Sequence, residues 1–181
     1  MNAIEMALAF ISTLLGLYLL LMIIRIYVLC LSALRYDKLL ARAPVNKELL
    51  ARRPFVSILI PTYNEENVIE RLMEAVTSLD YEPYEVIVVD DSTDRTTEIL
   101  ARWADHPRVK VIHRDHREGW KGGALNEGLK HLDPRSEFVL IFDADFIPPK
   151  DVIQRLLARF TSDKIAAVQG YHLAILNATE N

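Results

Sequence analysis

Two carboxylates that follow an apolar run of the sequence could hold a metal ion. Asp143 and Asp145 come directly after the run 138–142 and are separated by one alanine. Alternate side chains of an extended segment point to the same side. Two carboxylates so placed suit Mg²⁺ or Mn²⁺, and such an ion would neutralise charge on a departing phosphate oxygen. We therefore expect a metal site at Asp143 and Asp145; the plain alternative is a turn cap at Asp145 and a solvated Asp143.

A second acidic pair, Asp90 and Asp91, follows the apolar run 85–89. One of the two can cap the helix expected after it. The other can accept hydrogen bonds from a nucleobase N–H group or a ribose hydroxyl. Tyr63 follows the run 55–60 and can stack on a base, although a packing role also fits its position. These residues indicate a nucleotide as one ligand of the protein.

Four of the six glycines lie in the ten-residue window 119–128, together with Lys121. Glycine lets backbone approach a ligand closely, and the N-terminus of a helix favours anions. A lysine adds a point charge that suits phosphate. The segment matches neither the dinucleotide-binding fingerprint nor the P-loop, which argues against a dehydrogenase or a P-loop NTPase. A flexible turn before a helix is the alternative.

The polar clusters alternate with apolar runs that predict an α/β fold. Continuous apolar runs predict strands, and apolar residues at helical spacing predict helices. The expected strands are 55–60, 85–89, 109–112 and 137–142, with 165–168 as a candidate fifth, and the expected helices are 66–79, 94–104, 121–131 and 148–160. This alternation predicts a mostly parallel sheet with helices on both faces. Ligands of such sheets bind outside the carboxyl ends of the strands, where the polar clusters lie.

The first 35 residues predict a transmembrane helix. Met6–Ile24 holds 19 residues without a charge, which at about 1.5 Å per residue is close to the hydrocarbon thickness of a bilayer. A signal peptide fits less well because the start is acidic and the apolar core is too long; a buried soluble helix is the other alternative. All seven basic residues of 1–53 follow this stretch. The positive-inside rule then predicts a single-pass protein of the cell membrane with a cytoplasmic catalytic domain.

Composition predicts three parts: a transmembrane helix over 1–35, a basic juxtamembrane connector over 36–53 and an α/β domain over 54–181. Residues 1–53 carry a net charge of +4, and residues 54–181 carry −8. Because this domain carries a large negative charge, it does not attract nucleic acid electrostatically, and we expect no nucleic-acid partner. A hydrophobic content of 51% and a single cysteine exclude a disordered chain and a disulfide scaffold.

Four motifs together resemble the family 2 glycosyltransferases, which have the Rossmann-like GT-A fold. The motifs are Val56–Glu66, Val88–Asp94, Lys121–Asn126 and Phe142–Asp145. They occur in the family's order over roughly 55–170. The Lys-Gly-Gly-Ala-Leu-Asn element, with Val168 and Gln169 further on, looks most like the cellulose-synthase-like branch of processive polysaccharide synthases.

The resemblance implies a UDP- or GDP-sugar donor, a divalent metal (Mg²⁺ or Mn²⁺), and inverting transfer to a polysaccharide or lipid acceptor at the membrane. By the same resemblance, Thr62, Tyr63 and Glu65 line the nucleoside pocket and Asp91 contacts the base. Lys121 lies near the nucleotide or its diphosphate. Asp143 lies close to the donor, and Asp145 ligates the metal most directly.

The sequence also departs from the family's pattern. The family needs a further Asp as general base, and the synthases carry a Gln-x-x-Arg-Trp element; neither follows Asp145 here. We therefore expect an N-terminal, donor-binding portion with an incomplete domain. A non-catalytic nucleotide-sugar-binding module or a truncated pseudoenzyme is the alternative. A nucleotidyltransferase ranks last, because Pro61–Glu66 is not the glycine-rich, basic loop of that class.

Overall fold

The structure is a computed structural model that describes residues 2–170, with side chains described outside 36–42. It divides into two units after Pro44. The first unit is a single helix, α1 (Ala3–Arg42), which runs past the expected end at residue 35 without a break. The predicted three-part division therefore has no secondary-structure boundary at 35 and stays a prediction.

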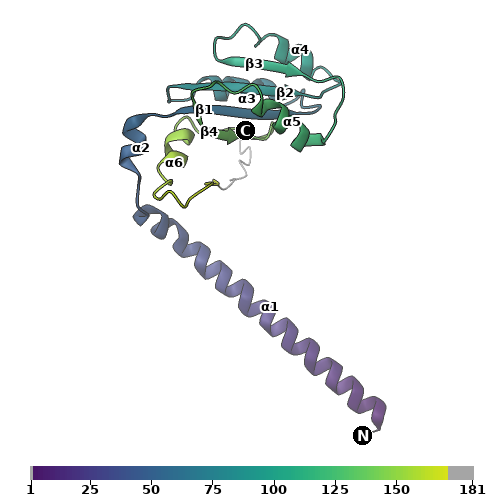
Figure 1. Cartoon of the computed structure of the whole chain (residues 1–181). Coiled ribbons are helices and arrows are strands. Elements are labelled where there is room, and N and C mark those ends of the chain that lie inside the picture. The colour runs from purple at the N-terminus through teal and green to yellow at the C-terminus, as the bar shows by residue number, and fades with distance from the viewer. Residues whose placement is uncertain (1, 171–181) are drawn as a thin grey trace, which may run out of the picture. The chain divides into compact units, whose positions relative to one another are not determined.

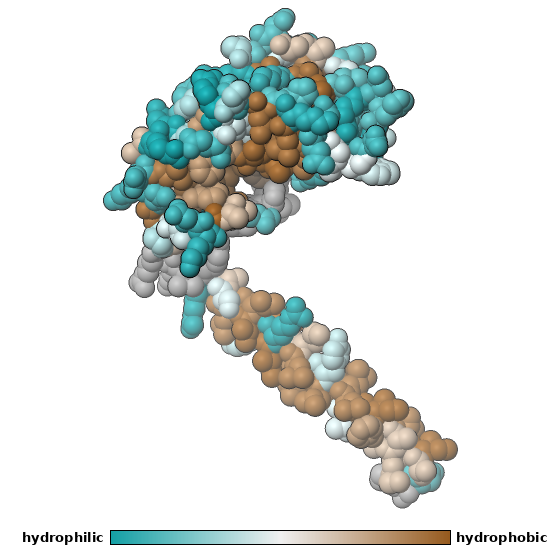
Figure 2. All heavy atoms as spheres, in the orientation of Figure 1, coloured by the Kyte–Doolittle hydropathy of each residue, from teal (hydrophilic) through white to brown (hydrophobic). Residues whose placement is uncertain are grey.

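Helix α1 is long and apolar enough to cross a membrane over Ala3–Arg35, where its mean hydropathy is 2.5 and none of its apolar window is buried. Figure 2 shows the apolar side chains along its visible surface. Hydroxyl groups on this helix bond to its own backbone: the Thr13 hydroxyl donates to the Ala9 carbonyl and the Ser32 hydroxyl to the Val28 carbonyl. A helix that spans a bilayer must form such internal hydrogen bonds, because the hydrocarbon offers its polar groups no water.

The second unit contains a parallel sheet of four strands, in the order β3-β2-β1-β4 (Figure 1). The strands are β1 (Phe55–Thr62), β2 (Tyr84–Asp90), β3 (Val109–His113) and β4 (Ser136–Ile141). These are the four predicted strands, lengthened by one or two residues at some ends, except that β4 ends one residue earlier than predicted. The register places Thr62 beside Asp90 and Asp90 beside His113. Three carboxyl ends are therefore level at one edge of the sheet.

Helices cover both faces of the sheet, as predicted. They are α2 (Lys47–Arg52), α3 (Ile69–Thr77), α4 (Thr96–Ala101), α5 (Trp120–Leu129) and α6 (Val152–Leu157). On one face, Ile58 and Val88 join a large core with side chains from α2, α3, α4 and α6. On the other face, Leu59 and Ile87 pack against Ala124 of α5. Burial on both faces explains why the runs that form β1 and β2 are apolar at nearly every position.

Strand β4 differs from the other strands because only one of its faces is covered. Phe138 and Leu140 pack on the large core, whereas Val139 and Ile141 are 42% and 49% exposed. The candidate fifth strand at 165–168 is wrong: its described backbone is irregular and lies in no strand pairing. Two alanines at its centre are exposed, so the run lacks the burial that stabilises a parallel strand.

Candidate active site

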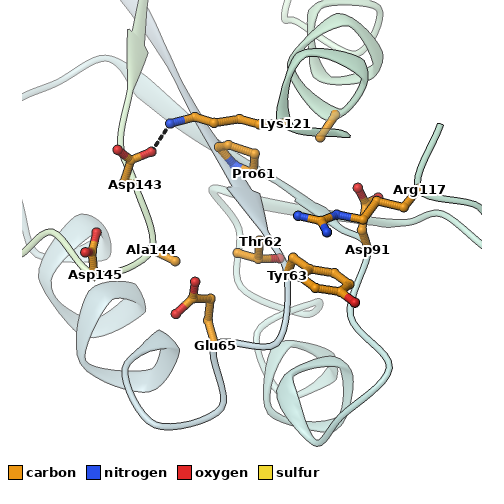
Figure 3. Close-up of a pocket in the computed structure, with 11 residues that line it drawn as sticks. Pro61, Thr62, Tyr63, Glu65, Asp91, Arg117, Lys121, Asp143, Ala144 and Asp145 are labelled. Atoms are coloured by element: carbon orange, nitrogen blue, oxygen red, sulfur yellow. Dashed lines mark hydrogen bonds and ion pairs between the residues drawn. The ribbon is translucent and has the colours of Figure 1, made fainter. Parts of the chain in front are cut away.

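A pocket of about 380 Å³ lies at the carboxyl ends of the strands (Figure 3). All seven side chains singled out in the sequence line it: Thr62, Tyr63, Glu65, Asp91, Lys121, Asp143 and Asp145. Pro61, Arg117, Ala124 and Ala144 complete the lining. The volume is in the range of small-molecule sites. The topology thus brings the carboxyl ends of all four strands and the start of α5 to one cavity.

Asp143 and Asp145 follow β4 and lie on one side of this pocket. Both are exposed, whereas Phe142 before them and Ala144 between them are buried, as the expected alternation requires. Lys121 reaches across from α5 and forms an ion pair with Asp143 (Figure 3). Both partners of this pair are more than half exposed, so it contributes little to stability.

Negative charge accumulates on this side of the pocket. Burial raises the pKa of Glu65, and repulsion from Asp145, Asp94 and Asp143 raises it further. A divalent cation would relieve that repulsion, and carboxylates are the ligands that Mg²⁺ and Mn²⁺ prefer. Within the described residues no group of three or more His, Cys, Asp or Glu side chains is arranged around a metal position. The donor set therefore fits a cation held by the Asp143–Asp145 pair together with oxygens of a ligand.

The loop after β1 presents Tyr63 to the pocket because hydrogen bonds fix its backbone. Asn64 adopts φ +56°, a left-handed conformation that asparagine tolerates. Its amide N–H donates to the Ser92 hydroxyl at 2.8 Å, and its side-chain oxygen accepts from the Thr93 amide at 2.9 Å. The Glu65 amide donates to the Thr96 hydroxyl at 2.9 Å. The loop is therefore tied at successive residues to the segment that follows β2.

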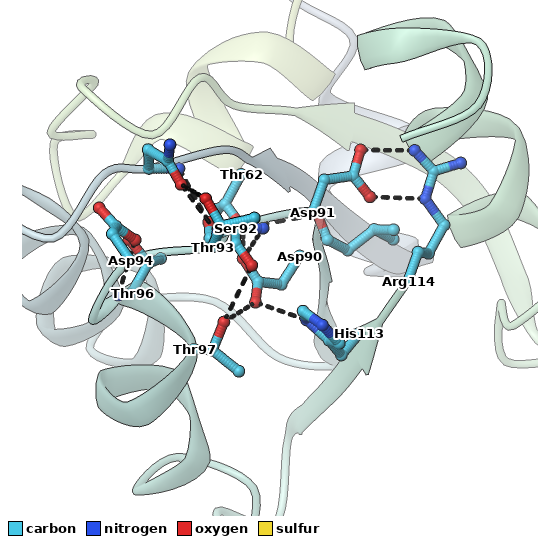
Figure 4. A network of polar contacts seen from close by, with 12 residues as sticks. Thr62, Asp90, Asp91, Ser92, Thr93, Asp94, Thr96, Thr97, His113 and Arg114 are labelled. Carbon is cyan, nitrogen blue, oxygen red and sulfur yellow. Dashed lines mark hydrogen bonds and ion pairs between the residues drawn. The ribbon is translucent and has the colours of Figure 1, made fainter. Parts of the chain in front are cut away.

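Asp90 joins the ends of three strands below the pocket (Figure 4). Its carboxylate is fully buried and accepts hydrogen bonds from the hydroxyls of Thr62 at 3.0 Å and Thr97 at 2.7 Å. His113 Nδ1 lies 2.9 Å from Asp90 Oδ2, the oxygen that also accepts from Thr97. The Asp90 carboxylate caps no helix end, and the His113 side chain stays 40% exposed despite this contact. The Thr62 hydroxyl is committed to Asp90.

Asp91 faces the pocket, and Arg114 holds its carboxylate (Figure 4). The guanidinium donates from Nε at 2.6 Å and from Nη2 at 2.5 Å. The Asp91 side chain is 3% exposed and the Arg114 side chain 14%. The Asp91 hydrogen bonds raise the pKa of Arg114, which keeps the guanidinium charged. Arg114 also donates to the carbonyls of Glu118 and Trp120, so the pair orders the segment leading into α5.

The glycines at the start of α5 have different roles. A Cβ on Gly123 would lie 1.9 Å from the Glu118 carbonyl oxygen, whereas a Cβ on Gly122 would meet nothing within 4 Å. Gly119 has φ +70° and Trp120 φ +54°, so the chain makes a tight left-handed entry into the helix. Gly123 is therefore required by close backbone packing, and Gly122 is not.

Three features around the pocket were not predicted from the sequence. They are the places of Arg114 and Arg117 and the burial of Asp90 among the ends of three strands. Arg114 and Arg117 lie in the polar segment after β3, where nothing in their spacing separates them from solvated charges. The adjacency of Asp90 to Asp91 at a strand end was the available signal, because consecutive residues of a strand point to opposite faces. One of the two then had to point away from the ligand.

Comparison with known proteins assigns the family. The model of glycosyl transferase family 2 matches residues 57–179, so the chain belongs to this family. A β-monoglucosyldiacylglycerol synthase from Nostoc sp. is 40% identical over 141 residues, which is 75% of this chain and 30% of that protein. Glucomannan 4-β-mannosyltransferase 7 from Arabidopsis thaliana is 36% identical over 130 residues, covering 66% of this chain and 23% of that one. The chain thus spans less than a third of the length of these relatives.

Solved structures confirm the GT-A fold. A mannosyltransferase from Pyrobaculum calidifontis in complex with GDP-Man and Mn²⁺ has a TM-score of 0.58 and 34% identity, over 68% of this chain and 36% of that one. Glucosyl-3-phosphoglycerate synthase from Mycobacterium tuberculosis in complex with UDP has a TM-score of 0.51 and 25% identity, over 64% of this chain and 43% of that one.

Proposed function

We propose that this chain is the donor-binding part of a membrane-attached glycosyltransferase, which takes a UDP- or GDP-sugar with Mg²⁺ or Mn²⁺ and transfers the sugar with inversion to a lipid or polysaccharide acceptor. One observation carries the proposal: seven side chains from four separate segments line one cavity at the carboxyl edge of the sheet. Membership of family 2 and the GDP-Man and UDP complexes of similar structures support it.

The two sides of the pocket suit the two ends of a nucleotide sugar. Tyr63 and Asp91 lie on one side (Figure 3), where an aromatic face and a carboxylate suit a base and its N–H groups. Asp143 and Asp145 lie on the other side and would hold the cation, which supplies charge neutralisation for a diphosphate leaving group. Lys121, in the first turn of α5, places its ammonium beside Asp143, where it would meet a diphosphate. A donor with a nucleoside, a diphosphate and a sugar spans such a site.

The transfer itself is an in-line displacement. The acceptor oxygen forms a bond to the anomeric carbon while the bond from that carbon to the diphosphate oxygen breaks, and the bonding electrons leave with the nucleoside diphosphate. The acceptor hydroxyl gives its proton to a general base. Attack opposite the leaving group inverts the anomeric centre. Asp151 and Asp163, the carboxylates that follow the Asp143–Asp145 pair within residues 2–170, do not line the pocket. The residues described here therefore serve the donor.

Attachment to a membrane through α1 completes the proposal. The apolar span Ala3–Arg35 and the basic residues that follow it favour a helix that crosses the bilayer with the pocket unit on the cytoplasmic side. A site held at the membrane surface suits lipid or growing polysaccharide acceptors. The glycolipid and polysaccharide activities named for the relatives support both acceptor classes equally.

Calorimetry on the full chain in detergent tests the donor site. We expect UDP-sugars or GDP-sugars to bind with micromolar to millimolar affinity when Mn²⁺ is present and at least tenfold more weakly after chelation. Asp145→Asn should remove the metal dependence because it neutralises one ligand. Asp163→Asn is the matched control, since Asp163 is exposed and outside the pocket. Equal binding by wild type and Asp145→Asn, or no binding of any donor, contradicts the proposal.

The same titrations separate the alternative function. Incubation of the full chain with donor, Mn²⁺ and lipid or oligosaccharide acceptors, followed by mass spectrometry, detects transfer. Binding without transfer is the result expected of a donor-binding part or a non-catalytic module. The two are then distinguished by adding the downstream portion of the reading frame, which restores transfer only if this chain is part of an enzyme.

A further inference from the structure

Arg117 occupies the position in the pocket where a flat ligand would stack. Its guanidinium carbon lies 3.5 Å from the centre of the Tyr63 ring and 4.6 Å from the centre of the Trp120 ring. Figure 3 shows the guanidinium directly beside Tyr63. A separation of 3.5 Å is van der Waals contact. Nothing can lie against this face of Tyr63 unless the guanidinium first leaves it.

Arg117 also differs from the other cationic side chains around the pocket in having no anionic partner among the residues that the structure describes. Arg114 pairs with Asp91, and Lys121 pairs with Asp143. Within the described side chains Arg117 takes part in no ion pair, and its buried Nε has no hydrogen-bond partner. A buried N–H without an acceptor is unfavourable. Arg117 is therefore the pocket's cation that remains available to an anionic ligand.

We propose that Arg117 is an exchangeable placeholder on the nucleobase position. In the free protein its guanidinium covers Tyr63; a nucleoside diphosphate displaces it, the base takes its place on the ring, and the freed guanidinium pairs with the diphosphate. This inference rests on the proposed function, because it requires a nucleotide in the pocket. A guanidinium suits both states: its plane stacks on aromatic rings, and its paired N–H groups match phosphate oxygens.

The exchange makes the site respond to phosphate as well as to the base. A nucleoside without phosphate must displace the Arg117 guanidinium from Tyr63, but it carries no anionic group with which the guanidinium could pair. A nucleoside diphosphate removes it and offers it a better partner. Arg117 then favours UDP or GDP over uridine or guanosine, and it weakens binding of flat molecules that carry no negative charge.

The test compares nucleosides with nucleoside diphosphates by calorimetry on the full chain in detergent with Mn²⁺. For Arg117→Ala we expect uridine or guanosine to bind as well as to wild type or better, while UDP or GDP binds about tenfold or more weakly, the size of a lost charged hydrogen bond. Arg117→Lys keeps the charge but not the flat group. Arg117→Lys should bind the nucleoside with the same affinity as Arg117→Ala, and it should lose only part of the affinity for the diphosphate.

Arg135→Ala is the matched control, because Arg135 also stacks on an aromatic ring, Phe55, and lies outside the pocket. It should change neither affinity, and unfolding midpoints should show that each variant is folded. Unchanged affinities in Arg117→Ala, or equal losses for nucleoside and diphosphate, overturn the placeholder role while leaving the donor site intact. If wild-type protein binds neither UDP nor GDP, the proposed function fails, and this inference fails with it.

Discussion

Asp90 and Asp91 are consecutive in the chain, but their carboxylates belong to separate polar networks. Asp90 lies fully buried among Thr62, Thr97 and His113, whereas Asp91 lines the pocket and pairs with Arg114. The alternation of a strand sends one carboxylate inward and the other toward the ligand. One therefore maintains the shape of the pocket edge, and the other forms part of its surface.

Replacing Asp90 with alanine should destabilise the fold. The change leaves the hydroxyls of Thr62 and Thr97 and the ring of His113 without their shared acceptor. Buried donors that lose a charged partner cost roughly 1.5–3 kcal/mol, so we expect the free energy of unfolding in urea to fall by about 3 kcal/mol. Asp163→Ala, at an exposed site, should change it by less than about 0.5 kcal/mol. Similar free energies of unfolding for both variants would contradict the role of Asp90 in joining the three strand ends.

The same carboxylate predicts a loss of stability in acid. Burial by itself would raise the pKa of Asp90, but hydrogen bonds from Ser92, Thr97 and His113 outweigh it, and the pKa lies below its usual value of 3.8. A lowered pKa in the folded state contributes stability that is complete above about pH 4 and is lost as the pH falls through the folded value. Unfolding free energies measured from pH 6 downward should therefore drop below pH 4. The drop should be smaller in Asp90→Asn; an identical pH profile would count against this assignment.

Two neighbouring glycines should respond oppositely to alanine. Gly123→Ala places a methyl group 1.9 Å from the Glu118 carbonyl oxygen, so the entry into α5 must shift, at a cost of about 1–3 kcal/mol or more. Gly122→Ala meets nothing within 4 Å and should stabilise the helix by about 0.5–1 kcal/mol. Urea unfolding of the two variants checks this prediction, and equal effects would show that the left-handed entry is not fixed.

The Arg114–Asp91 pair should behave as one unit. Arg114→Lys loses the two-pronged contact and the link to the 118–120 carbonyls, and Arg114→Ala leaves a buried carboxylate unpaired at a cost of about 3–5 kcal/mol. In Arg114→Met with Asp91→Leu the loss should be smaller than the sum of the single losses. A double-mutant cycle in urea measures this coupling, and additive effects would show that the pair is not a unit.

The membrane assignment predicts that two charges in α1 release the chain from the bilayer. Leu17→Arg with Leu20→Arg costs about 6 kcal/mol of insertion free energy, whereas Leu17→Ala with Leu20→Ala costs far less. The fraction of protein that stays in the membrane pellet after alkaline carbonate extraction should fall for the arginine variant and not for the alanine variant. Equal retention of both would argue against a spanning helix.

Most of the fold could be predicted from the sequence because the central strands β1 and β2 are buried on both faces. Such strands are apolar at nearly every position, and each apolar run gives way to polar residues, as the run that ends at Ile60 does at Thr62. The run 165–168 was misleading for the same reason: it is apolar and short, but no burial accompanies it. Arg117 could not be predicted, because its contacts with Tyr63 and Trp120 depend on the left-handed turn at 119–120.

The half-covered strand β4 has a practical consequence for anyone who purifies this polypeptide. In the described residues its backbone pairs only with β1, and Val139 and Ile141 face water. An unpaired edge with apolar side chains readily recruits strands from other molecules. Concentrated samples should therefore self-associate through this edge, and a lysine at position 139 should keep them monodisperse.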